Sequence, residues 1–293
     1  MAHITFNFHS QVLDFHQTVH LLVPDANIYG CLNNGPDTAD IPVLYLLHGL
    51  KGAAHTWTSY TSIERYLYES EKKMVVVMPE MHNNFYTDQA IGWKYLTYVA
   101  EELPCIVETF LRVSPKRENT YVAGLSMGGY GAVKMALTYP EKFGFAASFS
   151  GAMDIVALMQ DDKDKSEIVH AGESLRGKKS DTDIVLETKE FIFGPHGSIK
   201  GSKNDLYSLL EQTAKGDKPL PELYISCGSA DVLFPAAVDM KNRAKALGYK
   251  VKFHDERNMG HSWAFWDKEI EKLIRDMTVQ EYLLFVSELK GKK

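Results

Sequence analysis

The chain has 293 residues, of which 45% are apolar and 24% charged, so it can bury a sizeable core and differs from a disordered or low-complexity chain. Its 32 Lys and Arg against 38 Asp and Glu give a net charge of −6, which excludes the basic footprint of a protein that binds nucleic acid or an anionic membrane. The start of the chain has neither a basic segment nor an apolar one, and no apolar run approaches the roughly 20 residues that span a bilayer. With three scattered cysteines, we expect a soluble, reduced, cytoplasmic protein without a metal site.

The first forty residues alternate between apolar and polar side chains. The alternation runs through Ile4–Phe8 and returns at Val19–Val23, and a turn is predicted at Asn33–Pro36. A period of two is typical of strands with one buried face. We therefore expect antiparallel strands at one edge of a sheet.

Short apolar runs then alternate with longer helix-like stretches. Apolar residues recur at steps of three and four from Trp93 to Phe110, where Pro104 should kink or break the helix, and again from Trp263 to Met277. Runs that are apolar on both faces favour buried parallel strands, and their alternation with helices predicts βαβ crossovers. We expect one domain over residues 1–293, an α/β fold with a mostly parallel twisted sheet and helices on both faces. The expected strands lie at Val43–Leu47, Met74–Met78, Tyr121–Ala123, Phe145–Ala147, Leu223–Ile225 and Tyr249–Phe253.

A charged region interrupts this alternation of expected strands and helices. Residues 161–190 carry fifteen charged side chains between two expected strands. A solvated insertion and a functional lid are both compatible with this composition. We expect a cap or lid insertion at about residues 155–215.

Gly124–Gly128 matches the pattern G-x-S-x-G around Ser126. A strand-like segment, Asn119–Ala123, precedes it, and a helix-like segment, Gly129–Leu137, follows. A strand, a sharp turn and a helix together lift a serine Oγ above the sheet edge. Ser126 is therefore the predicted nucleophile.

A serine hydroxyl needs a base within hydrogen-bond reach, and in hydrolases of this architecture the chain order is serine, acid, histidine. His261 lies in a loop directly after Gly260 and before the last helix, so it can reach over the sheet edge. We predict His261 as the base and keep His254, at the end of the apparent last strand, as the alternative.

The acid should follow the strand that ends near Cys227. Asp231 lies there, at the carboxyl end of a parallel strand, where ligands of such sheets gather. We predict Asp231 as the acid. It could instead cap the helix that starts near Phe234, and Asp239 and Asp255 are the other nearby carboxylates.

The intermediate of acyl transfer needs two donors for its oxyanion. One should be the backbone N–H of Met127, directly after the nucleophile, and the other should come from the loop after the Val43–Leu47 strand. We predict Leu50 as this second donor. His48, in the same loop, could be a metal ligand, but a role in fixing the loop is favoured.

Four segments resemble the esterase D type of α/β-hydrolase, with most similarity to bacterial tributyrin-type (acetyl) esterases. They are Leu47–Leu50, Gly124–Ala132, Cys227–Asp231 and Gly260–Trp263. Two further segments, Asn84–Asp88 and Glu102–Pro104, are similar to the same subgroup. The resemblance spans about residues 4–275. It implies the α/β-hydrolase fold and a serine carboxylesterase that hydrolyses short-chain esters, acetyl to butyryl, through an acyl-enzyme and without a cofactor.

Other activities stay open. S-formylglutathione hydrolases usually carry Thr-Cys where this chain has Lys51-Gly52, which weighs against them, and feruloyl or aryl esters are further substrates of relatives. An acyltransferase would use the same triad, and an inactive α/β-hydrolase would act as a binding module. The expected partner is a small-molecule ester, and a homo-oligomer is left open. Aromatic side chains could line an aryl pocket or belong to the core: Trp57, Tyr86, Trp263 and Trp266.

Overall fold

The computed structural model describes residues 1–25, 41–111, 113–160, 188–195 and 199–291, and for residues 278–291 it describes the backbone alone. Strands form where the sequence carries its apolar runs. The described residues form one eight-stranded sheet. The strands are β1 (Ala2–Ser10), β2 (Phe15–Val23), β3 (Val43–Leu47), β4 (Val75–Pro79), β5 (Thr120–Leu125), β6 (Phe145–Phe149), β7 (Glu222–Gly228) and β8 (Val251–Glu256).

The strand order is β1-β2-β4-β3-β5-β6-β7-β8. β1 pairs with β2, and β2 with β4, in antiparallel fashion, whereas all later pairs are parallel. This confirms the predicted fold class, including the antiparallel N-terminal strands at one edge. Every residue of β3, β4 and β5 is buried, because helices cover both faces of the sheet there.

The last strand differs from its prediction. β8 begins at Val251 and continues to Glu256, past the expected end at Phe253. It is an edge strand whose first half alternates between apolar and polar side chains, whereas its second half, His254–Glu256, is polar throughout and carries no apolar residue to mark it.

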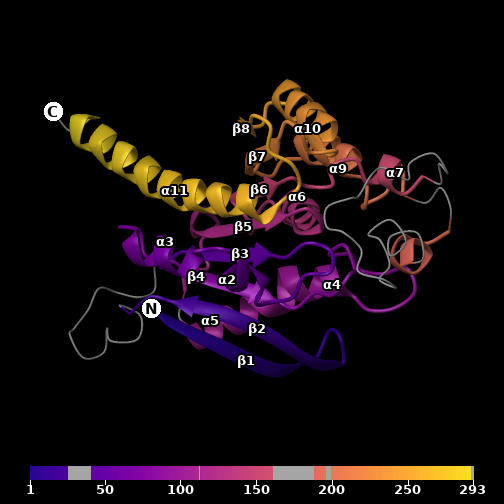
Figure 1. The fold of residues 1–293 in the computed structure, drawn as a ribbon, viewed down its shortest axis with the longest axis horizontal. Coiled ribbons are helices and arrows are strands. Elements are labelled where there is room, and N and C mark those ends of the chain that lie inside the picture. The colour runs from indigo at the N-terminus through magenta and orange to yellow at the C-terminus, as the bar shows by residue number, and fades with distance from the viewer. Residues whose placement is uncertain (26–40, 112, 161–187, 196–198, 292–293) are drawn as a thin grey trace.

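Helices pack on both faces of the sheet (Figure 1). One face is covered by α6 with α5, α9 and α10, and the other by α2, α3 and the long α11. The described helical elements are α2 (Thr56–Tyr60), α3 (Ile63–Glu69), α4 (Tyr95–Thr97), the π-helical η2 (Tyr98–Glu102), α5 (Leu103–Leu111), the 3₁₀ turn η3 (Arg117–Asn119), α6 (Met127–Thr138), α7 (Ile155–Leu158), α9 (Leu206–Lys215), α10 (Phe234–Ala246) and α11 (Trp263–Gly291).

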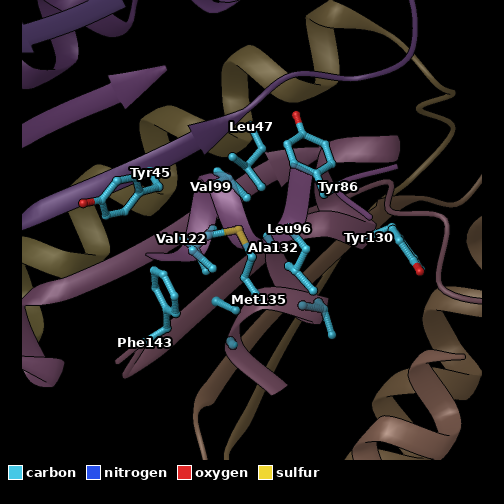
Figure 2. Packing of buried hydrophobic residues seen from close by; sticks show 14 of the residues in the cluster. Tyr45, Leu47, Tyr86, Leu96, Val99, Val122, Tyr130, Ala132, Met135 and Phe143 are labelled. Atoms are coloured by element: carbon cyan, nitrogen blue, oxygen red, sulfur yellow. The ribbon is translucent and has the colours of Figure 1, made fainter. Parts of the chain in front are cut away.

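Alternate residues of the strands feed two hydrophobic clusters. Tyr45 and Val122 point to the face of α6, and Figure 2 shows them in one cluster with Ala132 and Met135 of that helix. Leu44 and Leu46 point to the opposite face, toward α11. Because a slip of one residue would exchange the two faces, this packing fixes the register of the strands that carry the site.

The helix predicted from Trp93 to Phe110 runs without a gap from Tyr95 to Leu111, and its hydrogen-bond pattern changes before Pro104. The chain forms α4, then the π-helical turn η2, and Pro104 lies in the first turn of α5, where its missing N–H leaves no bond unmade. Lys142 Nζ donates to the carbonyl of Ala100, four residues before the proline, at 3.2 Å. The kink or break expected at Pro104 is a π-helical turn just before the proline, and the helix does not end there.

Two predicted features fall largely outside the described residues. The turn at Asn33–Pro36 lies there entirely, as do residues 161–187 of the charged insertion. The described parts of that insertion include α7 and α9, whose Leu206 and Leu210 join the core beside α6. Within the described part of the chain, no helix is both long and apolar enough to span a membrane.

Candidate active site

Ser126 lies in a sharp turn between β5 and α6. Its backbone adopts φ 53° and ψ −117°, a left-handed conformation that a non-glycine residue rarely takes. The turn is held by neighbouring strands, because the Ser126 N–H donates to the carbonyl of Phe149 at 2.9 Å and the Ser126 carbonyl accepts from Ala152 N–H at 3.3 Å. The strain therefore persists because the surrounding sheet determines the turn.

Glycines allow two chain segments to meet at this turn. A Cβ on Gly124 would lie 2.4 Å from the backbone of Gly128, and a Cβ on Gly128 would lie 2.5 Å from the carbonyl oxygen of Leu47. No real side chain fits these distances. The spacing of the G-x-S-x-G pattern thus brings the loop after β3 directly against the start of α6.

The structure brings Ser126, His261 and Asp231 together. His261 Nε2 lies 3.0 Å from Ser126 Oγ, and His261 Nδ1 lies 2.8 Å from Asp231 Oδ2. An ionised carboxylate only accepts, so Nδ1 carries the proton and Nε2 accepts from the serine hydroxyl. Trp266 packs edge-to-face on the imidazole, with ring centroids 4.9 Å apart. This arrangement can remove a proton from Ser126.

Asp231 lies in the turn after β7, and its carboxylate has no exposed surface. Burial favours the neutral acid, but hydrogen bonds from His261, the Leu233 N–H and the Ser150 hydroxyl outweigh it and hold the pKa of Asp231 below its ordinary value. Oδ1 accepts the Leu233 N–H, just before α10, at 2.9 Å. Asp231 therefore both fixes the entry to the helix and orients His261.

The alternative residues lie elsewhere. His254 points to the face of α11, where its Nδ1 lies 2.8 Å from Glu269 Oε1. Asp239 pairs with Arg243 on the surface of α10 at 2.8 Å. Asp255 is an exposed residue of β8. None of these contacts involves Ser126.

The loop after β3 has one peptide group held in a fixed orientation. The carbonyl of Gly49 accepts from His48 Nδ1 at 2.8 Å and from the Gly52 N–H at 3.0 Å. His48 Nε2 accepts the Met81 N–H at 3.1 Å, so the ring is the neutral Nδ1–H tautomer. Because the C=O and N–H of one peptide group point in opposite directions, these bonds turn the Leu50 N–H away from His48. Both ring nitrogens of His48 make hydrogen bonds that hold this loop in place, which agrees with the predicted role of His48 in fixing the loop.

The fixed peptide lies beside the nucleophile. A Cβ on Gly49 would be 3.4 Å from the Cβ of Ser126. Among the described residues, no hydrogen bond uses the backbone N–H of Leu50 or of Met127, the first residue of α6. Two free donors next to a serine hydroxyl suit a developing oxyanion.

A second loop supports the first, and the sequence did not reveal it. The Tyr86 hydroxyl donates to the carbonyl of His48 at 2.8 Å, and Asn83 Oδ1 accepts the Lys51 N–H at 2.8 Å. Phe85 and Tyr86 both have left-handed φ angles near 50°. No glycine marks this conformation, so only the resemblance of Asn84–Asp88 drew attention to the segment.

The four aromatic candidates divide by burial. Trp57 and Tyr86 have no exposed surface, and Trp266 is almost fully buried, so these three belong to the core. Trp263 is partly exposed and stacks on Tyr60 with ring centroids 4.9 Å apart.

The strand order, the turn at Ser126 and the helices on both faces define an α/β-hydrolase. The Esterase family model matches residues 25–277, and the chain belongs to this family of carboxylic ester hydrolases. The solved structure of FphF, a fluorophosphonate-binding serine hydrolase of Staphylococcus aureus, is 32% identical with a TM-score of 0.78, covering 94% of this chain and 98% of that one.

Two further comparisons agree with this assignment. The S-formylglutathione hydrolase FrmB of Staphylococcus aureus has a TM-score of 0.77 at 31% identity, covering 94% of this chain and 98% of that one. An acetyl esterase of Caldicellulosiruptor saccharolyticus is 27% identical over 271 residues, which are 92% of this chain and 96% of the relative.

Proposed function

We propose that the protein is a serine carboxylesterase for short-chain acyl esters, acetyl to butyryl, and that Ser126, His261 and Asp231 are its catalytic triad. The observation that carries the proposal is the continuous line of hydrogen bonds from Ser126 Oγ through both nitrogens of His261 to Asp231. A hydroxyl becomes a nucleophile when such a base accepts its proton.

The proposed reaction has two steps. His261 takes the proton of Ser126 as Oγ attacks the ester carbonyl, and the N–H groups of Leu50 and Met127 stabilise the oxyanion. His261 then protonates the leaving alcohol, which leaves an acyl-enzyme. Water, deprotonated by the same imidazole, hydrolyses that intermediate and restores Ser126.

The triad is tested with Ser126→Ala and with Ser59→Ala, an exposed serine of α2, as the matched control. We expect Ser126→Ala to lower kcat on p-nitrophenyl acetate by several powers of ten and to abolish labelling by a fluorophosphonate, with an unchanged circular dichroism spectrum. The control should keep both. Near-full activity of folded Ser126→Ala protein would reject the triad, and a wild-type chain that resists the probe would favour an inactive binding module.

The preference for short acyl groups is supported by the acetyl esterase relative and is tested separately. Rates on p-nitrophenyl acetate, butyrate and octanoate should fall along the series, and a feruloyl ester should react slowly. A maximum at octanoate or at the feruloyl ester would remove the short-chain proposal without touching the triad.

S-formylglutathione hydrolysis is the second candidate, favoured by the similarity to FrmB over nearly the whole chain. A kcat/KM for S-formylglutathione at least 100-fold above that for p-nitrophenyl acetate would select it. Acyl transfer is distinguished by product analysis with added alcohols, since a transferase forms a new ester. A cytoplasmic location and a single domain with a cap at about residues 155–215 stay predictions.

A further inference from the structure

One carboxylate joins the two loops that follow β3 and β4. Glu80 is the first residue after β4, and the parallel strands β3 and β4 present their carboxyl ends at the same edge of the sheet. Its Oε2 accepts the Ala54 N–H, in the loop after β3, at 3.0 Å, and its Oε1 accepts the His82 N–H, in the loop after β4, at 3.0 Å. Oε1 also lies 3.5 Å from His48 Nε2 and from His82 Nδ1. Glu80 therefore contacts both loops, beside His48.

A carboxylate suits this position because it accepts two N–H groups at once. At neutral pH a glutamate side chain is ionised and offers two acceptor oxygens and no donor. Ala54 is buried, so its N–H has to find an acceptor within the protein, and the Glu80 side chain is itself only 20% exposed. Removal of the carboxylate would leave the Ala54 N–H without this acceptor and would release one connection between the two loops.

Hydrogen bonds to the loop after β4 hold two strained residues. His82 and Lys51 have φ angles of 51° and 60°, in the left-handed region that non-glycine residues rarely adopt. The His82 N–H donates to Glu80, and the Lys51 N–H donates to Asn83 Oδ1 at 2.8 Å. Such conformations persist where the surrounding structure determines them. Since Asn83 directly follows His82, the turn that Glu80 fixes at His82 also sets where Asn83 meets Lys51.

Leu50 lies between two peptide groups that are both held. The carbonyl of Gly49, in the peptide before it, accepts from His48 Nδ1 at 2.8 Å. The N–H of Lys51, in the peptide after it, donates to Asn83 at 2.8 Å. Only two backbone dihedral angles, φ and ψ of Leu50, separate these two peptide planes. Holding both planes therefore restricts the direction of the Leu50 N–H, the proposed oxyanion donor.

We propose that Glu80 and Asn83 are positioning residues for the Leu50 N–H: Glu80 fixes the turn at His82, and Asn83, on that turn, holds the peptide that follows Leu50. This inference rests on the proposed function, in which the Leu50 N–H stabilises the oxyanion. Both side chains act through the backbone of the loop after β3 and not on the substrate. Their effect is to fix the donor in one direction before the substrate binds, so that no reorganisation is needed when charge develops.

The test removes the carboxylate with Glu80→Ala and replaces one of its oxygens by an amide NH₂ with Glu80→Gln. Glu118→Ala is the matched control, because Glu118 is an exposed glutamate of η3, at the amino end of β5. Glu80→Ala should lower kcat on p-nitrophenyl acetate about 10-fold, with KM within about twofold, because a misdirected oxyanion donor is missed only in the transition state. Glu80→Gln, which keeps one acceptor, should lie between Glu80→Ala and the wild type, and Glu118→Ala should match the wild type. A wild-type kcat in folded Glu80→Ala protein would overturn the proposal.

A transition-state analogue separates positioning from general damage. A trifluoromethyl ketone adds to a serine Oγ and forms a tetrahedral oxyanion, so its Ki depends on the same donors as the reaction. In Glu80→Ala, Ki should rise by the same factor as kcat/KM falls, and an unchanged Ki beside a lower kcat would exclude a role at the oxyanion donor. Ser126→Ala is measured in the same assays. Its inactivity together with a wild-type kcat in Glu80→Ala rejects the positioning role alone and leaves the triad intact, whereas an active Ser126→Ala protein rejects the triad.

Asn83 gives an independent pair of variants if Glu80→Ala fails to fold. Asn83→Ala removes the acceptor of the Lys51 N–H, whereas Asn83→Asp keeps an oxygen there. We expect about a fivefold lower kcat for Asn83→Ala and a smaller loss for Asn83→Asp, with KM unchanged. The acid limb of the pH profile of kcat/KM reports the base of the free enzyme, so its midpoint in Asn83→Ala should stay that of the wild type. Equal kcat values for Asn83→Ala and the wild type, or a shifted midpoint, would refute the role of Asn83.

Discussion

At the scale of single residues, the side chain of His48 orients the backbone N–H of another residue, Leu50. Its Nδ1–H holds the carbonyl of Gly49, and Met81 N–H fixes its tautomer from the other side. The Leu50 N–H is then directed away from His48 without a bond of its own. Preorganised donors of this kind cost no reorganisation when charge develops.

Replacing His48 with alanine should release the Gly49–Leu50 peptide. We expect kcat on p-nitrophenyl acetate to fall about 10- to 100-fold, because the Leu50 N–H, the proposed oxyanion donor, would be lost or misaligned, while KM changes little. His48→Asn, whose side-chain N–H can still donate, should retain more activity than His48→Ala. His9→Ala, an exposed histidine of β1, is the control, and equal losses in the alanine and asparagine variants would contradict this mechanism.

The sequence located the residues whose position follows from motif and chain order. Ser126 was marked by its glycines, and Asp231 and His261 by their places after successive strands. A supporting residue such as Tyr86 carried no such mark. Tyr86 has a left-handed φ without being glycine, and its role depends on a loop that meets His48 only after folding.

At the scale of elements, the start of α6 is packed too closely to the loop after β3 for any side chain larger than hydrogen. A Cβ on Gly128 would lie 2.5 Å from the Leu47 carbonyl oxygen and 2.7 Å from that of His48. Both atoms belong to backbone that cannot move without shifting β3 or the loop that follows it.

Gly128→Ala should therefore lower the free energy of unfolding by about 2–3 kcal/mol and reduce kcat as well. Gly216→Ala is the matched control, because Gly216 has φ −77° and its nearest neighbour lies 3.4 Å from the added Cβ. Urea denaturation of both variants measures the difference. An unchanged unfolding midpoint in Gly128→Ala would show that the loop after β3 can move to make room for the added methyl group.

The same helix buries a lysine completely. Lys134 Nζ donates to Thr87 Oγ1 and Asn204 Oδ1, each at 2.7 Å, and lies 5.4 Å above the Tyr130 ring. It joins α6 to two loops through uncharged acceptors. Burial lowers the pKa of Lys134 well below its ordinary value, since these groups do not replace the lost hydration.

This lysine should make stability rise with pH. The unfolded chain binds the Lys134 proton up to pH about 10.4, while the folded protein releases it at lower pH, so the free energy of unfolding increases over that window. Between pH 7 and 9.5 the wild type should gain stability relative to Lys134→Met. The exposed Lys245→Met control should show no such gain, and a pH-independent difference for Lys134→Met would refute the shift.

Elements were predicted best where their pattern was strongest. The ends of the buried strands β3 and β5 lie within a few residues of the ends of the apolar runs that predicted them, because both faces of these strands need apolar side chains. The ends of edge strand β8 were misplaced and the π-helical turn η2 was not predicted, since pairing with one neighbour and a π-helical bond pattern depend on tertiary contacts rather than on periodicity.

At the scale of the whole molecule, Asp231, the proposed catalytic acid, also affects acid stability. The folded pKa of Asp231 lies below its unfolded value, so the ionised carboxylate stabilises the fold above pH about 3.9, and this contribution is lost as the pH falls through the lower folded pKa. The advantage of the wild type over Asp231→Asn should shrink as the pH falls from 6 to 3. Exposed Asp217→Asn should show no comparable change in urea denaturation, and a constant advantage for the wild type would contradict the lowered pKa.

The left-handed turn at Ser126 lowers the stability of the fold, although the proposed reaction needs it. A glycine there would relax the backbone of a turn that costs a serine of order 1–3 kcal/mol. In a lineage that is no longer selected for hydrolysis, Ser126→Gly would therefore remove the proposed nucleophile and raise the thermal stability of the protein. A descendant that had lost ester hydrolysis could keep the whole fold, and a glycine at position 126 would be the first sign in its sequence that its function had changed.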